Sequence, residues 1–130
     1  MTGPKTVDRE PLVIAKQGYF YAGGAYRDGS PGAPFVGQMY VEYQIPQELK
    51  APHPIVMVHG GQQNGTNWTG TPDGREGWAQ YFLRRGHAVY VVDQVARGRS
   101  PWHPNVQGPL APLDREFADR RFAAPGRFEH

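Results

Sequence analysis

The sequence predicts an α/β fold in which an antiparallel pair of strands precedes a βαβ unit. Three observations support this class. Residues 36–45 alternate between apolar and polar side chains, as a strand with one solvated face does. Two short, continuous apolar runs follow at 55–58 and 88–92, and such runs suit strands buried on both faces of a parallel sheet. The segment between these runs has helix signals, and a helix is the usual crossover between parallel strands.

The antiparallel pair is expected at 12–21 and 36–45. A loop over 23–34 separates the two strands, because that segment contains six glycines and prolines. In the second strand the apolar residues fall on one face, and the other face carries Gln38, Glu42 and Gln44. A polar face indicates a half-solvated antiparallel strand, so we expect the two strands to pair across the loop.

The crossover helix is predicted to begin at Asp73. Asp73 serves as its capping residue, and Glu76 three residues later completes the pattern of a capping box. Gly86 follows the helix at the C′ position. An aromatic face and cations in the last turn also favour a helix, and they come from Trp78, Phe82, Arg84 and Arg85. The βαβ unit over 55–92 is therefore the central structural prediction.

The flanking regions are expected to be less regular. Residues 1–11 read as a polar leader, and 12–100 form the N-terminal part of the α/β domain. Residues 101–130 begin with a proline-rich loop and contain a short helix at 113–122. No closing strand or helix follows, so the sheet is expected to be truncated, with the remainder of the domain missing.

Composition argues against several classes of function. The chain has 14 Lys+Arg against 12 Asp+Glu, and these charges are interspersed, so no nucleic-acid partner is expected. It contains no cysteine, and its five histidines lack the spacing of metal ligands, so no metal site is expected. No run approaches the ~18 apolar residues of a membrane span. The polar N-terminus lacks the core of a signal peptide, which leaves the cytoplasm as the default compartment.

The chemistry is expected in the turn after the first apolar run, which contains the glycine pair Gly60 and Gly61. Such a pair lets backbone N–H groups face a ligand, and ligands of open α/β sheets bind at this edge. Glycines at 60, 61 and 65 do not match the dinucleotide fingerprint, although Asp93 imitates its ribose-binding acid. The spacing from Gly60 to Thr66 matches a phosphate loop, but the required lysine is missing. An oxyanion hole of backbone N–H donors fits best.

A series of short motifs continues this pattern along the chain. In order they are His59-Gly60-Gly61, Asn67-Trp68, Thr71-Pro72-Asp73-Gly74-Arg75, Gly77-Trp78, Tyr81-Phe82-Leu83, Gly86, Val92-Asp93-Gln94 and Arg97-Gly98-Arg99-Ser100. Over about residues 36–100, these motifs resemble a bacterial esterase branch of the α/β-hydrolase superfamily. The resemblance implies an eight-stranded fold of which these are strands one to four. It also implies Ser-acid-His chemistry on a small-molecule ester, without a cofactor.

The resemblance assigns roles to five residues of this chain. By position, Gly61 would supply an oxyanion-hole N–H, and Gln62 is a neighbour that could assist. His59, Gly60 and Asp93 are expected to be structural residues near the site. His59 would hold the turn rather than act as a base, because no nucleophile is expected within its reach.

Asp93 and two tryptophans have further expected contacts. Asp93 would accept hydrogen bonds from the backbone or from Arg97 at the end of its strand. Trp68 and Trp102 are candidates either for the wall of an acyl pocket or for ordinary packing.

The nucleophile, acid and base are expected outside this chain, since the family places all three after the fourth strand. Only two serines are present, Ser30 and Ser100, and neither lies in a G-x-S-x-G sequence. We therefore expect an N-terminal fragment of a serine-dependent ester hydrolase, inactive alone and in need of the remaining domain or an oligomeric partner. The alternatives are a non-catalytic split module that acts as a binding or assembly partner, and a nucleotide-binding α/β domain.

Overall fold

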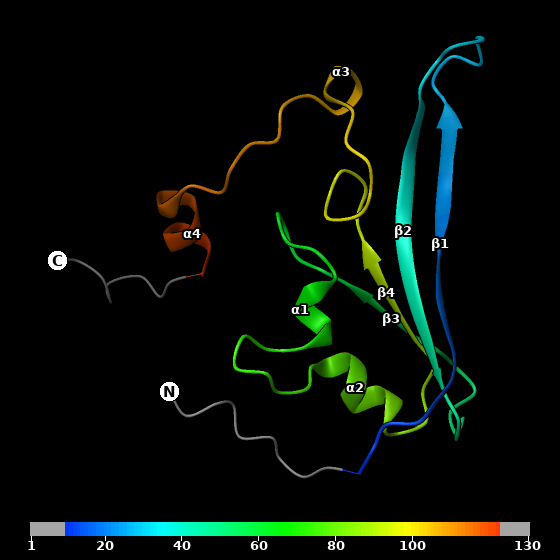
Figure 1. Ribbon diagram of the computed structural model, residues 1–130. Coiled ribbons are helices and arrows are strands. Elements are labelled where there is room, and N and C mark those ends of the chain that lie inside the picture. The colour runs from blue at the N-terminus through cyan, green and yellow to red at the C-terminus, as the bar shows by residue number, and fades with distance from the viewer. Residues whose placement is uncertain (1–9, 123–130) are drawn as a thin grey trace, which may run out of the picture.

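The protein forms a four-stranded mixed sheet with helices on one side of it (Figure 1). The computed structural model describes residues 10–122, so most of the expected leader lies outside the described residues. The strands are β1 (Ile14–Tyr26), β2 (Phe35–Pro46), β3 (Ile55–Val58) and β4 (Val89–Asp93). Their spatial order is β1-β2-β4-β3, with β3 and β4 parallel and the other two pairs antiparallel. The predicted α/β class, an antiparallel pair followed by a βαβ unit, is confirmed.

The β1–β2 hairpin is longer than the sequence predicts. Strand β1 was expected to end at residue 21, but its pairing continues until Tyr26 lies opposite Phe35. The rings of these two residues meet at 5.2 Å between centroids. Gly23 and Gly24, taken as loop residues, instead lie inside the strand with φ of 69° and 91°. Cross-strand aromatic contact therefore extends the hairpin past residues that favour a loop by themselves.

Strand β2 is not half-solvated, contrary to the sequence-based prediction. It lies between β1 and β4, and its residues from 38 onward are at least half-buried on both faces. Tyr19 stacks on Tyr40 at 5.5 Å, and the Arg99 guanidinium lies 4.0 Å from the same ring. Tyrosine and arginine side chains thus cover the face that carries the polar residues.

The crossover helix α2 (Trp78–Leu83) begins later than predicted. Asp73 does not cap it, because its carboxylate accepts hydrogen bonds from the Thr71 hydroxyl and from Arg75 Nε within a turn. Gly74 then adopts φ of 82°, a conformation that does not continue a helix. The N-cap is Gly77, whose N–H donates to Gln80 Oε1 at 3.0 Å. Glu76 forms an ion pair with Arg84 at 2.6 Å.

The core lies between α2 and the sheet. Ala79 and Leu83 on the helix are each 1% exposed, and they pack against the side chains of Met57, Val89 and Val91. Burial of one such leucine contributes roughly 1.5–3 kcal/mol. The helix therefore covers one face of the parallel pair and fixes where the turns after β3 and β4 begin.

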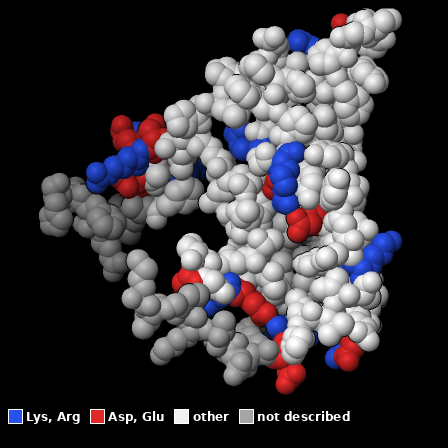
Figure 2. Space-filling model, viewed as in Figure 1, with Lys and Arg blue, Asp and Glu red and all other residues white. Residues whose placement is uncertain are grey.

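The remaining helices are short. A helix was predicted at 113–122, and the structure has α4 (Arg115–Phe122) there. The single turns α1 (Thr66–Thr69) and α3 (Pro104–Gln107) were not predicted. None of the helices between residues 10 and 122 is long and apolar enough to cross a membrane. In the view of Figure 2, acidic and basic side chains lie in mixed groups rather than in one patch.

The sheet exposes an apolar edge and an aromatic face. Within residues 10–122, β3 pairs only with β4, and it exposes 60% of Val56 and 52% of Val58. The same face carries the packed rings of Phe20, Tyr43 and Tyr90. The described helices lie on the opposite side of the sheet (Figure 1). An exposed apolar edge strand is a template for pairing with another strand.

We expect the 130-residue chain to self-associate, and Val56→Lys to shift it toward the monomer, because a charge on an edge strand opposes edge-to-edge pairing. Sedimentation velocity at several concentrations measures the shift. Leu49→Lys is the matched control, since Leu49 is 57% exposed but lies between β2 and β3. A wild-type chain that is monodisperse, monomeric and cooperative in melting would contradict this expectation.

Candidate active site

The candidate site lies at the carboxyl ends of the two parallel strands. The turn after β3 and the turn after β4 form opposite walls of a cavity of about 480 Å³. The predicted residues His59, Gly60, Gly61 and Gln62 all line it, together with a wall formed by Gln94, Val95, Ala96, Arg97, Gln107, Pro109, Leu110 and Ala111. Asp93 is 1% exposed and does not line the cavity. The structure thus brings four of the five predicted residues together around one space.

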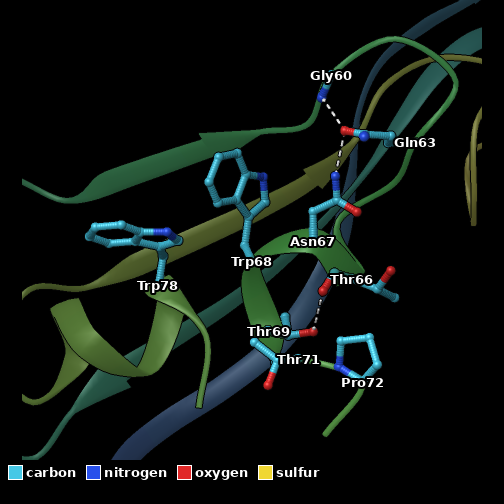
Figure 3. A pocket seen from close by; sticks show the side chains of 10 residues that line it. Gly60, Gln63, Thr66, Asn67, Trp68, Thr69, Thr71, Pro72 and Trp78 are labelled. Carbon is cyan, nitrogen blue, oxygen red and sulfur yellow. Dashed lines mark hydrogen bonds between the residues drawn. The ribbon is translucent and has the colours of Figure 1, made fainter. Parts of the chain in front are cut away.

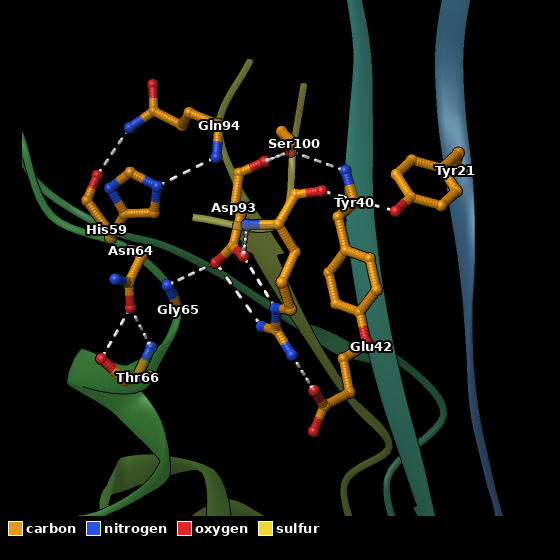
Figure 4. A network of polar contacts seen from close by, with 11 residues as sticks. Tyr21, Tyr40, Glu42, His59, Asn64, Gly65, Thr66, Asp93, Gln94 and Ser100 are labelled. Atoms are coloured by element: carbon orange, nitrogen blue, oxygen red, sulfur yellow. Dashed lines mark hydrogen bonds and ion pairs between the residues drawn. The ribbon is translucent and has the colours of Figure 1, made fainter. Parts of the chain in front are cut away.

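His59 holds the two turns together. The N–H of Gln94 donates to His59 Nε2 at 2.9 Å, and Gln94 Nε2 donates back to the His59 carbonyl at 2.7 Å (Figure 4). Because Nε2 accepts, the proton of the neutral ring is on Nδ1, which lies 2.8 Å from the Gly60 carbonyl oxygen. Both ring nitrogens are engaged and the residue is 4% exposed. This arrangement suits a residue that shapes the turn.

The ring of His59 also orients the peptide between Gly60 and Gly61. The Gly60 carbonyl accepts from His59 Nδ1 and from the Gln63 N–H at 3.3 Å. In a planar trans peptide, the carbonyl and the following N–H point in opposite directions. The N–H of Gly61 therefore points away from the imidazole. Within residues 10–122, no hydrogen-bond acceptor is found for the N–H of Gly61 or of Gln62.

Left-handed backbone at a non-glycine residue occurs in both turns. Gln62 has φ of 59°, and Ala96, in the facing turn, has φ of 63°. Such conformations are sparsely populated and cluster at functional sites, where the surroundings enforce them. The Gln62 side chain is tied across the cavity, since its Nε2 donates to the Ala111 carbonyl.

The buried carboxylate of Asp93 forms hydrogen bonds with both turns, and we call this group of contacts the clamp. Its Oδ1 accepts the Gly65 N–H at 2.6 Å, and its Oδ2 accepts both the N–H and the Nε–H of Arg99 at 2.8 Å (Figure 4). Of the partners predicted for Asp93, the backbone is confirmed by the N–H groups of Gly65 and Arg99, whereas Arg97 as the side-chain donor is wrong. Arg97 Nη1 instead donates to the Ala96 carbonyl at 2.9 Å. The tight turn from 94 to 100 returns Arg99, not Arg97, toward the carboxylate.

The electrostatics of the clamp favour the ionised carboxylate. Burial alone would raise the pKa of Asp93, but the hydrogen bonds from the Arg99 side chain, the Arg99 N–H and the Gly65 N–H lower it below the ordinary value. Arg99 also forms an ion pair with Glu42 on β2 at 2.5 Å. The ion pairs Glu42–Arg99 and Arg99–Asp93 therefore join β2 to β4, and the Gly65 N–H joins the turn after β3 to the same carboxylate.

Neither serine of the chain is placed as a nucleophile. Ser100 is 5% exposed, and its hydroxyl donates to the Asp93 carbonyl at 2.6 Å and accepts the Tyr40 N–H at 2.8 Å. The Ser30 hydroxyl donates to the Asp28 carboxylate at 2.6 Å on the exposed hairpin loop. Ser100 therefore acts as a connection between the turn and β2.

Several residues of this arrangement were missed by reasoning from the sequence. They are Gln94, which bonds to His59, and the members of the clamp, namely Arg99, Glu42, Ser100 and Gly65. The structure gives the reason for glycines at 65 and 98, because both flank the aspartate in space. A Cβ at Gly65 would lie 3.0 Å from Asp93 Oδ1, and a Cβ at Gly98 would lie 2.5 Å from Asp93 Oδ2.

Comparisons with known proteins relate the chain to a lipase and to an esterase. No family model matches the chain. Over 88 residues, or 68% of this chain, it is 47% identical to a probable secreted lipase phiG of a fungal species (strain ATCC 74256). It also matches a solved structure, described as the atomic resolution structure of a novel bacterial esterase, with a TM-score of 0.68 and 38% identity over 93% of this chain. The chain spans 22% of the lipase and 38% of the esterase.

The chain is related to the α/β-hydrolase esterases over part of its length. The four strands accordingly form part of an α/β-hydrolase sheet. The predicted resemblance to this family is thereby confirmed over part of the chain.

We expect Asp93→Asn to destabilise the protein by about 2 kcal/mol, because it weakens the hydrogen bonds that a buried carboxylate accepts from Gly65 and from the half-exposed Arg99. Since the pKa of Asp93 is lowered in the folded state, its contribution is complete above the unfolded value of about 3.9 and is lost as the pH falls through the lower folded value. Urea unfolding from pH 3 to 7 measures both effects.

Asp73→Asn is the matched control for this substitution. The pKa of Asp73 is also lowered, by hydrogen bonds from Thr71 and Arg75, but this pair is exposed and so contributes little. Equal losses of stability in the two variants would contradict the role of the clamp.

Proposed function

We propose that this chain supplies the oxyanion-hole part of an ester hydrolase active site, and that the nucleophile, acid and base lie outside it. The chain would be the N-terminal portion of a serine-dependent α/β-hydrolase acting on a small-molecule carboxylic ester. No cofactor takes part in this chemistry. The lipase and esterase relatives support the class of reaction.

The observation that carries the proposal is the orientation of the Gly60–Gly61 peptide. Ester hydrolysis places negative charge on the former carbonyl oxygen, and fixed N–H donors aimed at this oxygen stabilise the transition state. The His59 ring fixes the Gly60 carbonyl, so the Gly61 N–H is preorganised and has no acceptor among the described residues. The neighbouring Gln62 N–H is a second candidate donor, held in place by the left-handed backbone.

The open edge of β3 supports a second part of the proposal. A parallel strand added at this edge would end level with β3, and the turn that follows it would lie beside His59 and Gly61. In α/β-hydrolases the nucleophile follows a strand, and the residue after it supplies another oxyanion N–H. The missing strand would therefore bring the nucleophile and the second donor to the N–H of Gly61.

Two other functions were considered. A nucleotide-binding role would need Asp93 to reach a ribose, but its carboxylate is buried and engaged by Gly65 and Arg99. A non-catalytic module that binds a partner would use the same exposed edge of β3 as the missing strand. The ordered turn of His59 to Gln62 favours the hydrolase, because a binding module has no need for oriented, unpaired N–H donors.

The first test is hydrolysis of p-nitrophenyl acetate by the 130-residue chain, with and without a serine-directed phosphonate. We expect no turnover above a heat-treated control, because both serines are occupied in structural hydrogen bonds. Turnover that the phosphonate abolishes would mean that Ser30 or Ser100 is a nucleophile, and would overturn the proposal.

The second test removes the candidate donor in the protein encoded by the complete reading frame. Gly61→Pro eliminates the N–H, and we expect kcat to fall by about 10²–10³-fold. Gly61→Ala keeps the N–H, and its added Cβ meets no heavy atom within 4 Å, so it should retain most of the activity. Equal kcat values for the two variants would exclude the Gly61 N–H as an oxyanion donor.

A further inference from the structure

A second cavity, of about 680 Å³, adjoins the first at Gly60 of the candidate oxyanion turn (Figure 3). Gly60 lines this cavity as well as the first, so the two spaces share one wall. The rest of the lining comes from the turn, from α1 and from the start of α2, namely Gln63, Thr66, Asn67, Trp68, Thr69, Gly70, Thr71, Pro72 and Trp78. Its volume is that of a typical small-molecule site.

Two indole rings form the apolar part of the wall. Trp68 projects from α1 and Trp78 from α2, both on the side of the helices that faces Gly60 (Figure 3). Trp78 is 56% exposed, yet its ring is held by stacking on Phe82 at 6.1 Å and by an edge contact with Tyr81 at 5.5 Å. An aromatic ring that is both fixed and exposed is prepared to stack on a flat ligand.

The polar part of the wall is uncharged. None of the lining residues is acidic or basic, whereas Arg97 lines the first cavity. The Gln63 carboxamide is fixed, since its Oε1 accepts from the Gly60 N–H and from Asn67 Nδ2. The Trp68 indole N–H is buried and has no acceptor in the part of the chain that the structure describes. A charged ligand would lose its hydration here without gaining an ionic partner.

We propose that this cavity binds an uncharged aryl group of the ester, stacked on Trp78. This inference rests on the proposed function, because the cavity adjoins the candidate oxyanion turn at Gly60, the residue before Gly61, and an aryl group bound there would lie beside the reacting ester. The cavity would thereby select esters of aromatic alcohols or acids over charged ones.

The test measures binding rather than turnover. Phenylacetone replaces the ester oxygen of phenyl acetate with a methylene group, so it is not hydrolysed, and cyclohexylacetone is its saturated counterpart. Saturation-transfer NMR on the 130-residue chain gives the affinity for each ketone, and it works equally on monomers and on assemblies. We expect phenylacetone to bind several-fold more tightly than cyclohexylacetone.

Substitutions then locate the site. Trp78→Ala should weaken phenylacetone binding about two- to tenfold, and Trp78→Phe, which keeps an aromatic face, should restore most of it. Trp102→Ala is the matched control, since Trp102 is 42% exposed and lies outside this cavity. Equal affinity for both ketones, or no effect of Trp78→Ala, would overturn the aryl site.

Failure of this inference is distinguishable from failure of the proposed function. Binding of phenylacetone that depends on Trp78, in a protein whose complete chain hydrolyses no ester, would leave the aryl site standing and overturn the hydrolase. Hydrolysis of acetate esters by a complete chain that binds neither ketone would support the hydrolase and overturn the aryl site.

Discussion

The position of both turns at the candidate site depends on one buried carboxylate, that of Asp93. Its two oxygens accept hydrogen bonds from Gly65, at the end of the turn after β3, and from Arg99, at the end of the turn after β4. Because the group is 1% exposed, these bonds are little weakened by water. Glycines at 65 and 98 are needed beside it, since any Cβ there would meet a carboxylate oxygen at 3.0 Å or less.

The clamp at Asp93 and the ring of His59 have different structural roles. Asp93 fixes where the turns lie, and His59 fixes how the peptide between Gly60 and Gly61 is oriented. The hydrogen bonds between His59 and Gln94 connect the two groups, because Gln94 follows Asp93 directly in the chain. Backbone donors held in this way need no rearrangement when charge develops in front of them, which is the property that an oxyanion hole requires.

The two faces of the sheet differ in how they are covered. Helix α2 buries one face through Leu83 and Ala79, whereas the opposite face exposes Val56 and Val58 at the edge. The chain spans 38% of the bacterial esterase that it matches. The edge strand β3 leads directly into the candidate turn, since His59 follows Val58 in the chain.

The sequence by itself determined where the four strands occur, their class of sheet and the turn that carries the candidate donors, but not the end of β1 or the burial of β2. These features follow from local patterns, because hydrophobic period and paired glycines restrict the backbone over a few residues. The tertiary structure alone decided the start of α2, the choice of Arg99 over Arg97 and the cavity between Trp68 and Trp78. Asp73 looks like a cap until Thr71 and Arg75 occupy its carboxylate, and Asp93 finds its partners up to 28 positions away in sequence. Contacts of this kind depend on how the strands pair and pack, which no local pattern of residues encodes.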